Sequence, residues 1–512
     1  MADGKSKKKS ARRFSFLKLL DLVERWGNRL PHPFALFFLF ALAVLIVSWL
    51  AAAAGLTVTH PATGKAINAV NLLDRQGIQN ILTKAVSNFT GFAPLGTVLV
   101  AMIGVGVAER SGLFTAALKA LAAGVPGWLM TTALVFAAVN ADIVVDAGYV
   151  ILVPLGAVLF AGIGRHPLAG LAAAFAGVSG GFSSNIFLTP IDPLLAGLTQ
   201  EAARLYDPGY TVPITANYYF MIASVALQTI VAVWVTVRIV EPRLGPYTGA
   251  GQESMEPLGT DEKRGLRAAG ITFVAETLVL LLLTVPSNGL LRDADGALQP
   301  LFQGMVTLMA IGFLLPGLAY GFVTRTIASN RDVGRMIEET MSTMGSYVAL
   351  AFAASQFVAY FGWSNLGLIM AVTGAGLLQA SGLTGIALIV LFIFVCATID
   401  LFVASASAKW AVIGPVFVPM LMILGYSPEL TQAAYRIGDS FTNIVTPLMP
   451  YMPLIIAFAQ KYEPKLRLGT LMALMLPYSI AFAISWSILL ALWLLLGIPL
   501  GPGAALTYPR LP

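Results

Sequence analysis

The chain has 512 residues, of which 57% are hydrophobic and only 11% are charged. Soluble globular proteins carry about 25% charged residues, so the composition excludes a soluble protein. A mean hydropathy of +0.81 over the whole length excludes a soluble enzyme with a single anchor. No charge occurs between Phe34 and Gly55, and this stretch is long enough to cross a hydrocarbon layer of about 30 Å as a helix. Barrel strands alternate apolar and polar residues, and these runs do not. We therefore expect an all-α integral membrane protein.

The net charge of +6 is better explained by the membrane than by a nucleic acid partner. Basic residues gather at the cytoplasmic ends of membrane helices, and a basic segment, residues 1–32, precedes the first apolar run. This segment predicts a cytoplasmic N-terminus. The first apolar run is too long for the core of a cleavable signal peptide. The basic residues that carry this prediction are Lys5, Lys7, Lys8, Lys9, Arg12, Arg13 and Lys18.

The apolar runs divide the chain into two halves. The first half, residues 33–237, includes a polar stretch at 57–90 that the orientation places outside the cytoplasm. A basic linker with Pro and Gly, residues 238–267, joins it to the second half, residues 268–512. The apolar segments expected in the first half are 33–54, 94–107, 124–139, 143–163, 168–186 and 218–237. Those expected in the second half are 268–285, 304–323, 347–361, 366–378, 384–398, 402–424, 444–459 and 471–496.

Two regions, residues 140–193 and 400–453, are too polar or too interrupted by Gly and Pro to be ordinary spans. They resemble each other: Ser184-Asn185 with a following Thr-Pro matches Thr442-Asn443 with a following Thr-Pro, and Asp142 matches Asp400 upstream. Paired broken segments in two halves are typical of a transporter with a site at the membrane midplane. Irregular backbone at that depth must be buried in protein or line a cavity. We expect the two regions to be re-entrant hairpins or broken helices that meet around a water-filled, charged chamber.

The second half has the densest set of polar residues at membrane depth. A charge at the centre of the bilayer costs about 2.5–3.5 kcal/mol on insertion scales, so each one needs a function or a partner. Arg436 and Asp439 are three residues apart on one expected helix face. They form either an internal ion pair or a site where the guanidinium binds a substrate carboxylate and the aspartate takes a proton or a cation. Trp410 either stacks on an aromatic substrate or anchors the chain at the interface. The remaining candidates are Asp400, Lys409 and Asn443.

The first half offers a second set of candidates. Asp192 lies between Pro190 and Pro193, where a regular helix is not expected, so it is either a site residue or a loop carboxylate at the water interface. Asp142 and Asp146 are like charges four residues apart, which repel if both are ionised. The other candidates are Asn140 and Asn185.

We expect an ion gradient to drive this protein, because the sequence indicates neither a metal-catalysed reaction nor nucleotide binding. The three histidines show no metal-ligand spacing, and no Gly-rich nucleotide loop followed by Lys-Ser/Thr occurs. We therefore expect no cofactor. H⁺ and Na⁺ stay open as coupling ions, because a carboxylate can take a proton and hard cations bind Asp and Asn oxygens.

The run Arg-Ile-Gly-Asp-Ser-Phe-Thr-Asn-Ile-Val-Thr-Pro at 436–447, Trp410 upstream, and Gly-Gly-Phe-Ser-Ser-Asn at 180–185 resemble the p-aminobenzoyl-glutamate transporter (AbgT) family, and within it the bacterial antimetabolite exporters. The resemblance implies a homodimer in the bacterial inner membrane, with nine transmembrane helices and two re-entrant hairpins per subunit arranged as inverted repeats. It also implies a set of functional positions. Those for substrate are Trp410, Pro428, Arg436, Asp439 and Asp192; those for a cation are Asp439, Asn185, Asn443 and Asp400.

Four functions compete at this point. The resemblance favours a secondary transporter that exports sulfonamide-like antimetabolites or related folate-pathway aromatic acids. The alternative in the same class is an importer of p-aminobenzoyl-glutamate. An intramembrane enzyme that uses Asp142 and Asp146 is a distant alternative, because nothing completes such a site and the internal repeat stays unexplained. A passive channel is disfavoured because the charges are few and are not arranged in rings.

Overall fold

The computed structural model describes residues 33–59, 64–123, 125–144, 148–247, 258–403 and 405–509. Within these ranges the regular structure is almost entirely helical, as predicted. Two short strands, β1 (Thr57–Thr59) and β2 (Ala66–Asn68), pair antiparallel. The basic segment 1–32 and Asp146 lie outside the described residues, so the predictions made for them stay predictions.

Seven described helices are long and apolar enough to cross a membrane, and one bent pair makes an eighth crossing. α2 (Pro33–Ala53) matches the first predicted span. α3 (Arg75–Thr90) and α4 (Ala93–Arg110) together form a 36-residue apolar span, so the second part of the polar stretch at 57–90 is a helix that continues into the membrane. The other long helices are α10 (Tyr218–Val235), α12 (Thr260–Thr284), α14 (Met305–Thr324), α19 (Ala406–Ile423), α22 (Leu468–Leu496) and the bent pair α15 (Asn330–Thr343) and α16 (Gly345–Trp363).

The described ends of the predicted linker, residues 238–267, are helical. Its first residues continue α10 through a π-helical turn, η4 (Thr236–Val240), into α11 (Glu241–Leu244), and its last ones already belong to α12. A capping interaction at Gly259 fixes the start of α12, because the Glu262 carboxylate accepts the Gly259 backbone N–H at 2.7 Å. Acidic residues in a first turn stabilise the positive end of a helix.

The first interrupted region contains a hairpin and a broken helix. The hairpin consists of α6 (Met130–Val139), a 3₁₀ turn η1 (Ala141–Val144), a π turn η2 (Gly148–Leu152) and α7 (Val153–Gly162). Its outer ends are close together, since the Arg165 guanidinium after α7 donates to Thr131 Oγ1 in α6 at 2.5 Å. The broken helix consists of α8 (Pro167–Phe175), η3 (Ala176–Gly180), an irregular stretch and α9 (Ile191–Ala203). α5 (Leu113–Ala123) precedes the hairpin.

The second interrupted region repeats this arrangement. α18 (Gly385–Asp400) and α19 (Ala406–Ile423) form the hairpin, and the Gly385 N–H donates to the Tyr426 hydroxyl at 2.6 Å where its outer ends meet. α20 (Pro428–Asn443), an irregular stretch and α21 (Met452–Gln460) form the broken helix. The predicted apolar segment 444–459 is thus partly irregular rather than a continuous helix. α17 (Leu366–Ala380) precedes the hairpin, and α13 (Gln299–Gln303) lies before α14.

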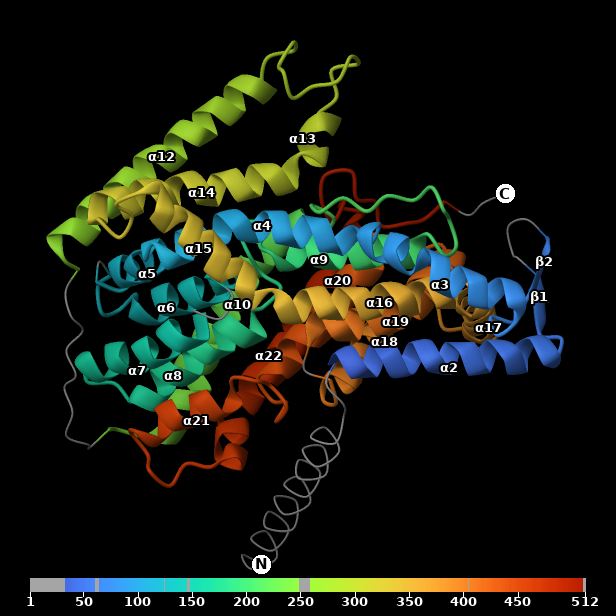
Figure 1. Cartoon of the computed structure of the whole chain (residues 1–512). Coiled ribbons are helices and arrows are strands. Elements are labelled where there is room, and N and C mark those ends of the chain that lie inside the picture. The colour runs from blue at the N-terminus through green and yellow to red at the C-terminus, as the bar shows by residue number, and fades with distance from the viewer. Residues whose placement is uncertain are drawn as a thin grey trace, which may run out of the picture.

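These groupings reproduce the predicted architecture. α19 is one arm of a hairpin and does not cross on its own, whereas α8–α9 and α20–α21 each cross as a pair of short helices. With α19 taken as a hairpin arm and each broken helix taken as one crossing, the described residues agree with the predicted nine crossings and two hairpins. In Figure 1 α6 and α7 approach the centre from the end occupied by α5, and α18 and α19 approach from the end occupied by β1 and β2. The two repeats are therefore inverted.

The two broken helices meet in the middle of the molecule. Ser179 Oγ in η3 lies 3.2 Å from Met449 Sδ in the second irregular stretch, and the Tyr149 and Tyr451 rings stack at 4.3 Å. Close approach also holds α20 against the second hairpin. A Cβ added to Gly438 would lie 2.4 Å from the Ile393 carbonyl oxygen, so glycine at this position lets the two backbones touch.

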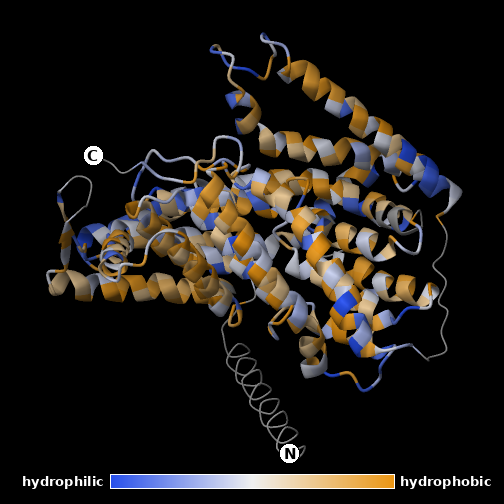
Figure 2. Cartoon of the chain, turned by 180° about the vertical axis from the view of Figure 1, so that it is seen from behind, coloured by the Kyte–Doolittle hydropathy of each residue, from blue (hydrophilic) through white to orange (hydrophobic). Residues whose placement is uncertain are grey.

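The outer surface is apolar along most of its helices, and hydrophilic residues gather at the amino-terminal end of α12 (Figure 2). α12 leaves the other helices toward its carboxyl-terminal end (Figure 1), and only 6% of its apolar window is buried. α14 packs on α4, where a Cβ added to Gly104 would lie 1.8 Å from the Ala310 carbonyl oxygen. The exposure of α12 fits contact with lipid or with another membrane subunit, because exposing so large an apolar face to water is unfavourable.

Candidate functional site

A cluster of charged side chains lies where the hairpins and broken helices meet. We call it the central cluster and define it as Asp142, Asp192, Asp400, Lys409, Arg436 and Asp439. The exposed fractions are 0% for Asp192 and Asp400, 1% for Lys409 and Asp439, 3% for Arg436 and 8% for Asp142. Isolated buried charges are very costly, so these groups must compensate one another or bind something. The cluster is closed to solvent in this structure.

Lys409 is the cation of the second hairpin region. Its ammonium contacts the Asp400 carboxylate directly and lies 2.6 Å from Asp439 Oδ1. Asp400 ends α18 and Lys409 lies in the first turn of α19, so the hairpin itself positions this pair. Asp439 lies about one turn before the carboxyl-terminal end of α20. Lys409 thereby joins the two arms of the hairpin through Asp400 and ties the hairpin to the broken helix through Asp439, both by charge-assisted contacts.

Arg436 does not pair with Asp439, so that interpretation of their spacing was wrong. Its Nη1 donates to Asp192 Oδ1 at 2.6 Å. The prediction that Asp192 lies outside regular helix was also wrong, because it belongs to the first turn of α9. Pro193 is compatible with that turn, where a proline lacks only an N–H that has no helical partner. Asp192 is fully buried and is not a loop carboxylate at the water interface.

The second carboxylate oxygen of Asp192 accepts hydrogen bonds from Thr189, just before the start of α9. Asp192 Oδ2 accepts the Thr189 backbone N–H at 2.7 Å and the Thr189 hydroxyl at 3.1 Å. These contacts fix the carboxylate, which in turn holds the Arg436 guanidinium by one of its terminal nitrogens. The other edge of that guanidinium, formed by Nε and Nη2, is buried and has no hydrogen-bond partner in the described part of the chain. This edge is the fork that binds a carboxylate with two parallel hydrogen bonds.

Trp410 is fully buried, so the interpretation as an interfacial anchor was wrong. Its ring stacks on Tyr435 at 4.3 Å with an interplanar angle of 22°. Its indole N–H donates to Thr199 Oγ1 at 2.8 Å, and the Thr199 hydroxyl lies 2.6 Å from Gln432 Oε1. Trp410 and Tyr435 form an aromatic pair one residue away from Lys409 and Arg436 respectively.

The Asn residues of the two breaks lie beside the aspartates of the cluster. Asn185 Nδ2 donates to Asp142 Oδ2 at 3.2 Å, and Asn443 Nδ2 donates to Asp439 Oδ2 at 3.3 Å. Asn140 is joined to the same region, because its Oδ1 accepts the Ile186 N–H at 2.9 Å. The structure thus brings Asn185 together with Asp142, and Asn443 together with Asp439.

Pro428, like Trp410, is a predicted substrate residue that is not part of the central cluster. It opens α20 and is buried there, two helical turns or about 12 Å along the axis from Arg436. Its neighbour Glu429 is also buried and accepts the Tyr210 hydroxyl at 2.9 Å. A role for Pro428 in the substrate pathway stays a prediction.

Sequence reasoning missed the partners that orient the predicted residues. The sequence identifies Lys409 as a charge at membrane depth but not its partner. Its spacing from Asp400 across a hairpin tip could have predicted that the two residues pair. Thr199 and Gln432 carry no signal in the sequence that links them to Trp410, because that contact joins residues more than 200 positions apart.

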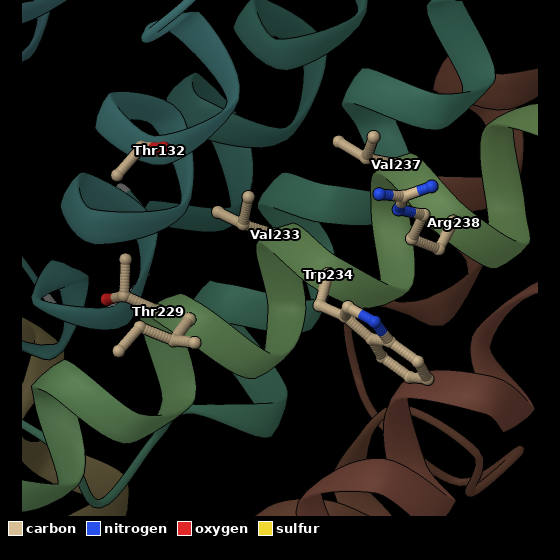
Figure 3. A pocket seen from close by; sticks show the side chains of 7 residues that line it. Thr132, Thr229, Val233, Trp234, Val237 and Arg238 are labelled. Atoms are coloured by element: carbon tan, nitrogen blue, oxygen red, sulfur yellow. The ribbon is translucent and has the colours of Figure 1, made fainter.

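A surface groove of about 360 Å³ lies elsewhere, along α10 beside α6 (Figure 3). Its lining is mainly apolar. Trp234 and Ile230 are exposed there, and Arg238 lies at one end of the groove. This lining suits lipid chains better than a polar anionic substrate, so the groove is not our candidate site.

Comparison with known proteins agrees with this architecture. Residues 18–508 match the sequence model described as the "AbgT putative transporter family". The chain is 39% identical over 497 residues to the p-aminobenzoyl-glutamate transport protein of Escherichia coli (strain K12), covering 96% of this chain and 97% of that protein.

Two solved structures are similar over nearly the whole chain. The YdaH transporter of Alcanivorax borkumensis superimposes with a TM-score of 0.88 at 44% identity, covering 92% of this chain and 100% of that one. MtrF of Neisseria gonorrhoeae, described as illuminating a class of antimetabolite efflux pumps, superimposes with a TM-score of 0.90 at 47% identity, covering 95% and 100%. Membership of a transporter family excludes the alternative of an intramembrane enzyme that uses Asp142 and Asp146. The chain is a multi-pass membrane protein that belongs to the AbgT family of secondary transporters.

Proposed function

We propose that this transporter exports sulfonamide-like antimetabolites or related folate-pathway aromatic acids, driven by a cation gradient. The observation that carries the proposal is the buried, unpartnered Nε–Nη2 edge of Arg436. The preceding residue on α20, Tyr435, stacks on Trp410. Such a fork binds an anionic group, and the aromatic pair favours a ring. Arylamine sulfonamides and p-aminobenzoyl-glutamate both combine a ring with an acidic group.

Cation coupling is supported by the charges of the central cluster. It contains four buried carboxylates and two buried cationic side chains. Uncompensated charge in a dry site is costly, and an anionic substrate adds to the negative excess. Binding of protons or metal cations together with the substrate relieves it. Asp439 is our candidate for the group that takes a proton, with Asp400, Asn185 and Asn443 as candidates for a cation site.

Trp410 is our candidate for the group that contacts the substrate ring. We expect Trp410→Ala to weaken the binding of aromatic substrates, because it removes the stacking surface. Aromatic pairs contribute roughly 0.5–1.5 kcal/mol beyond burial. The measurement is the KM for transport in proteoliposomes. Trp486→Ala is the matched control, since Trp486 is equally buried and donates to Ser224 Oγ at 2.7 Å outside the cluster. Equal KM values for Trp410→Ala and wild type would leave only a packing role.

Import of p-aminobenzoyl-glutamate is the alternative, and it is favoured by the name of the Escherichia coli relative. The two directions are separated by flux into and out of vesicles that contain the purified protein, with proton and sodium gradients imposed one at a time. Export predicts that an inward cation gradient drives labelled sulfonamide out of the cytoplasmic side. Accumulation of p-aminobenzoyl-glutamate on the cytoplasmic side under the same gradient would overturn export. Flux that is independent of both the proton and the sodium gradient would contradict cation coupling.

We further propose that the protein works as a homodimer in the bacterial inner membrane, with halves at 33–237 and 268–512. The apolar face of α12 supports a subunit contact, because Ile271, Leu278 and Leu282 are 71%, 55% and 71% exposed. The mass of the protein in nanodiscs, measured by light scattering, tests the dimer. A single chain per disc at all protein concentrations would contradict it.

A further inference from the structure

Three buried polar side chains connect the Trp410 indole to a backbone carbonyl. The indole N–H donates to Thr199 Oγ1 at 2.8 Å, and the Thr199 hydroxyl lies 2.6 Å from Gln432 Oε1. Gln432 Nε2 donates to Asn217 Oδ1 at 2.9 Å, and Asn217 Nδ2 donates to the Glu429 carbonyl oxygen at 2.9 Å. We call Thr199, Gln432 and Asn217 the polar bridge.

The polar bridge is dry and joins four separate elements. None of its three side chains is more than 2% exposed. Trp410 belongs to α19, Thr199 to α9 and Gln432 to α20, whereas Asn217 lies immediately before α10. A buried polar group that loses its hydrogen-bond partner is costly, so the polar bridge favours one arrangement of these elements around Trp410.

The two ends of the polar bridge fix the direction of every hydrogen bond in it. A carbonyl oxygen only accepts, so the Asn217 amide turns its NH₂ group to Glu429 and its oxygen to Gln432. The Gln432 amide then gives its NH₂ group to Asn217 and its oxygen to Thr199. That oxygen cannot donate, so the Thr199 hydroxyl donates to it, although the Leu195 carbonyl oxygen is also near, at 2.7 Å. A lone pair of the hydroxyl is left for the indole N–H, which only donates.

The polar bridge lies on the same helices as part of the central cluster. Gln432 precedes Arg436 by about one turn of α20, and Thr199 follows Asp192 by about two turns of α9. The Arg436–Asp192 ion pair and the Gln432–Thr199 contact therefore join the same two helices at two levels. A shift of Trp410 relative to these helices would break a buried hydrogen bond.

We propose that Thr199 and Gln432 are positioning residues for the substrate ring, because they hold the Trp410 indole in one orientation. Aromatic pairs depend on the relative orientation of the rings, so an indole that turns about its side-chain bonds keeps its apolar surface and loses its preferred contact geometry. Thr199 and Gln432 act through Trp410, so their role rests on the proposed function, in which Trp410 contacts the ring.

The test is a double-mutant cycle between Thr199 and Trp410, measured as the KM for transport of a labelled sulfonamide in proteoliposomes. Thr199→Val keeps the shape of the side chain and is expected to raise the KM about 3- to 10-fold, as the loss of one hydrogen bond does. Thr199→Ser keeps the hydroxyl and should retain the wild-type KM. Trp410→Phe keeps a ring without an N–H; in this background Thr199→Val should change the KM by less than about 2-fold, because groups that act through one another are not additive.

Gln432→Met tests the second positioning residue, because it keeps the length of the side chain without the amide. We expect it to raise the KM about 2-fold or more. Gln228→Met is the matched control, since Gln228 is fully buried on α10 and its amide has no partner among the described residues. Ser224→Ala is the control for the indole contact, because it removes the acceptor of the Trp486 N–H. Both controls should keep the wild-type KM.

Ultraviolet resonance Raman spectroscopy observes the polar bridge without transport, because one tryptophan band reports hydrogen bonding of the indole N–H. The difference between wild type and Trp410→Phe isolates Trp410 among the eight tryptophans. We expect the band of Trp410 to move to the position of an unbonded indole in Thr199→Val and to stay in place in Thr199→Ser.

Additive effects of Thr199→Val and Trp410→Phe on the KM would overturn the proposal, as would a wild-type KM in Thr199→Val together with a raised KM in Trp410→Ala. A wild-type KM in Trp410→Ala would overturn the proposed contact of Trp410 with the substrate and, with it, the positioning role. The Raman band would still move in Thr199→Val in that case, so a failure of the proposed function is distinguishable from a failure of the polar bridge.

Discussion

Asp439→Ala is expected to abolish substrate flux while folded protein stays in the membrane. Asp439 is one of two carboxylates that hold the Lys409 ammonium, and it also accepts Asn443 Nδ2. Without it the broken helix α20 loses its charged contact with the second hairpin and the site loses its candidate proton acceptor. Breaking a buried ion pair costs about 3–5 kcal/mol, although the contact of Lys409 with Asp400 still compensates part of the charge.

Flux of labelled substrate in proteoliposomes measures this effect, and size-exclusion chromatography in detergent checks the fold. Asp439→Asn keeps the shape of the side chain and removes only its charge, so it is expected to be as inactive as Asp439→Ala and to fold better. Glu339→Gln serves as a control because its ion pair with Arg110 is half-exposed, and such pairs contribute about 0–1 kcal/mol. Undiminished flux in Asp439→Asn would remove Asp439 from the mechanism.

Arg436→Lys is expected to raise the KM for an anionic substrate about 10- to 100-fold. A lysine can keep the contact with Asp192, but it is a point charge and lacks the Nε–Nη2 fork. Hydrogen bonds to charged groups contribute about 1.5–3 kcal/mol, which corresponds to that range. A sulfonamide that is uncharged at the assay pH should lose less affinity than a carboxylate substrate, because it does not use the fork in the same way.

The measurement compares the KM values of both substrates in the same preparation. Arg165→Lys is the matched control, since Arg165 makes two hydrogen bonds with the Glu241 carboxylate at 2.7 and 2.6 Å at a distance from the central cluster. An unchanged KM for the carboxylate substrate in Arg436→Lys would contradict a substrate role for the free edge. A loss of the same size for both substrates would point to a general structural effect of the substitution.

Much of the fold could be predicted because its signals are local. Apolar runs predict the long helices. The repeated Asp, and the repeated Asn with a Thr-Pro a few residues later, identify the two interrupted regions from the sequence alone. The extent of α3 and the start of α12 could not be predicted in the same way. Both lie in polar sequence, where a helix depends on capping and on the helices it joins rather than on hydropathy. The predicted linker and polar stretch accordingly include residues that are helical.

The site was predictable as a set of residues but not as a set of partners. Membrane-depth charge identifies Arg436, Asp439 and Asp400 because each is costly there. Which carboxylate meets which cation depends on tertiary packing. The spacing of Arg436 and Asp439 suggested a local pair, whereas the fold turns Arg436 toward Asp192 on α9 and Asp439 toward Lys409 on α19.

The uneven placement of cations in the two hairpins has a consequence for voltage. The second hairpin carries Asp400 and Lys409 together and is close to neutral, whereas the first carries Asp142 with no cationic partner in its described residues. A full elementary charge that crosses the bilayer gains or loses about 2.3 kcal/mol per 100 mV. When Asp142 is ionised, the electric field of an energised membrane therefore acts on the first hairpin more than on the second.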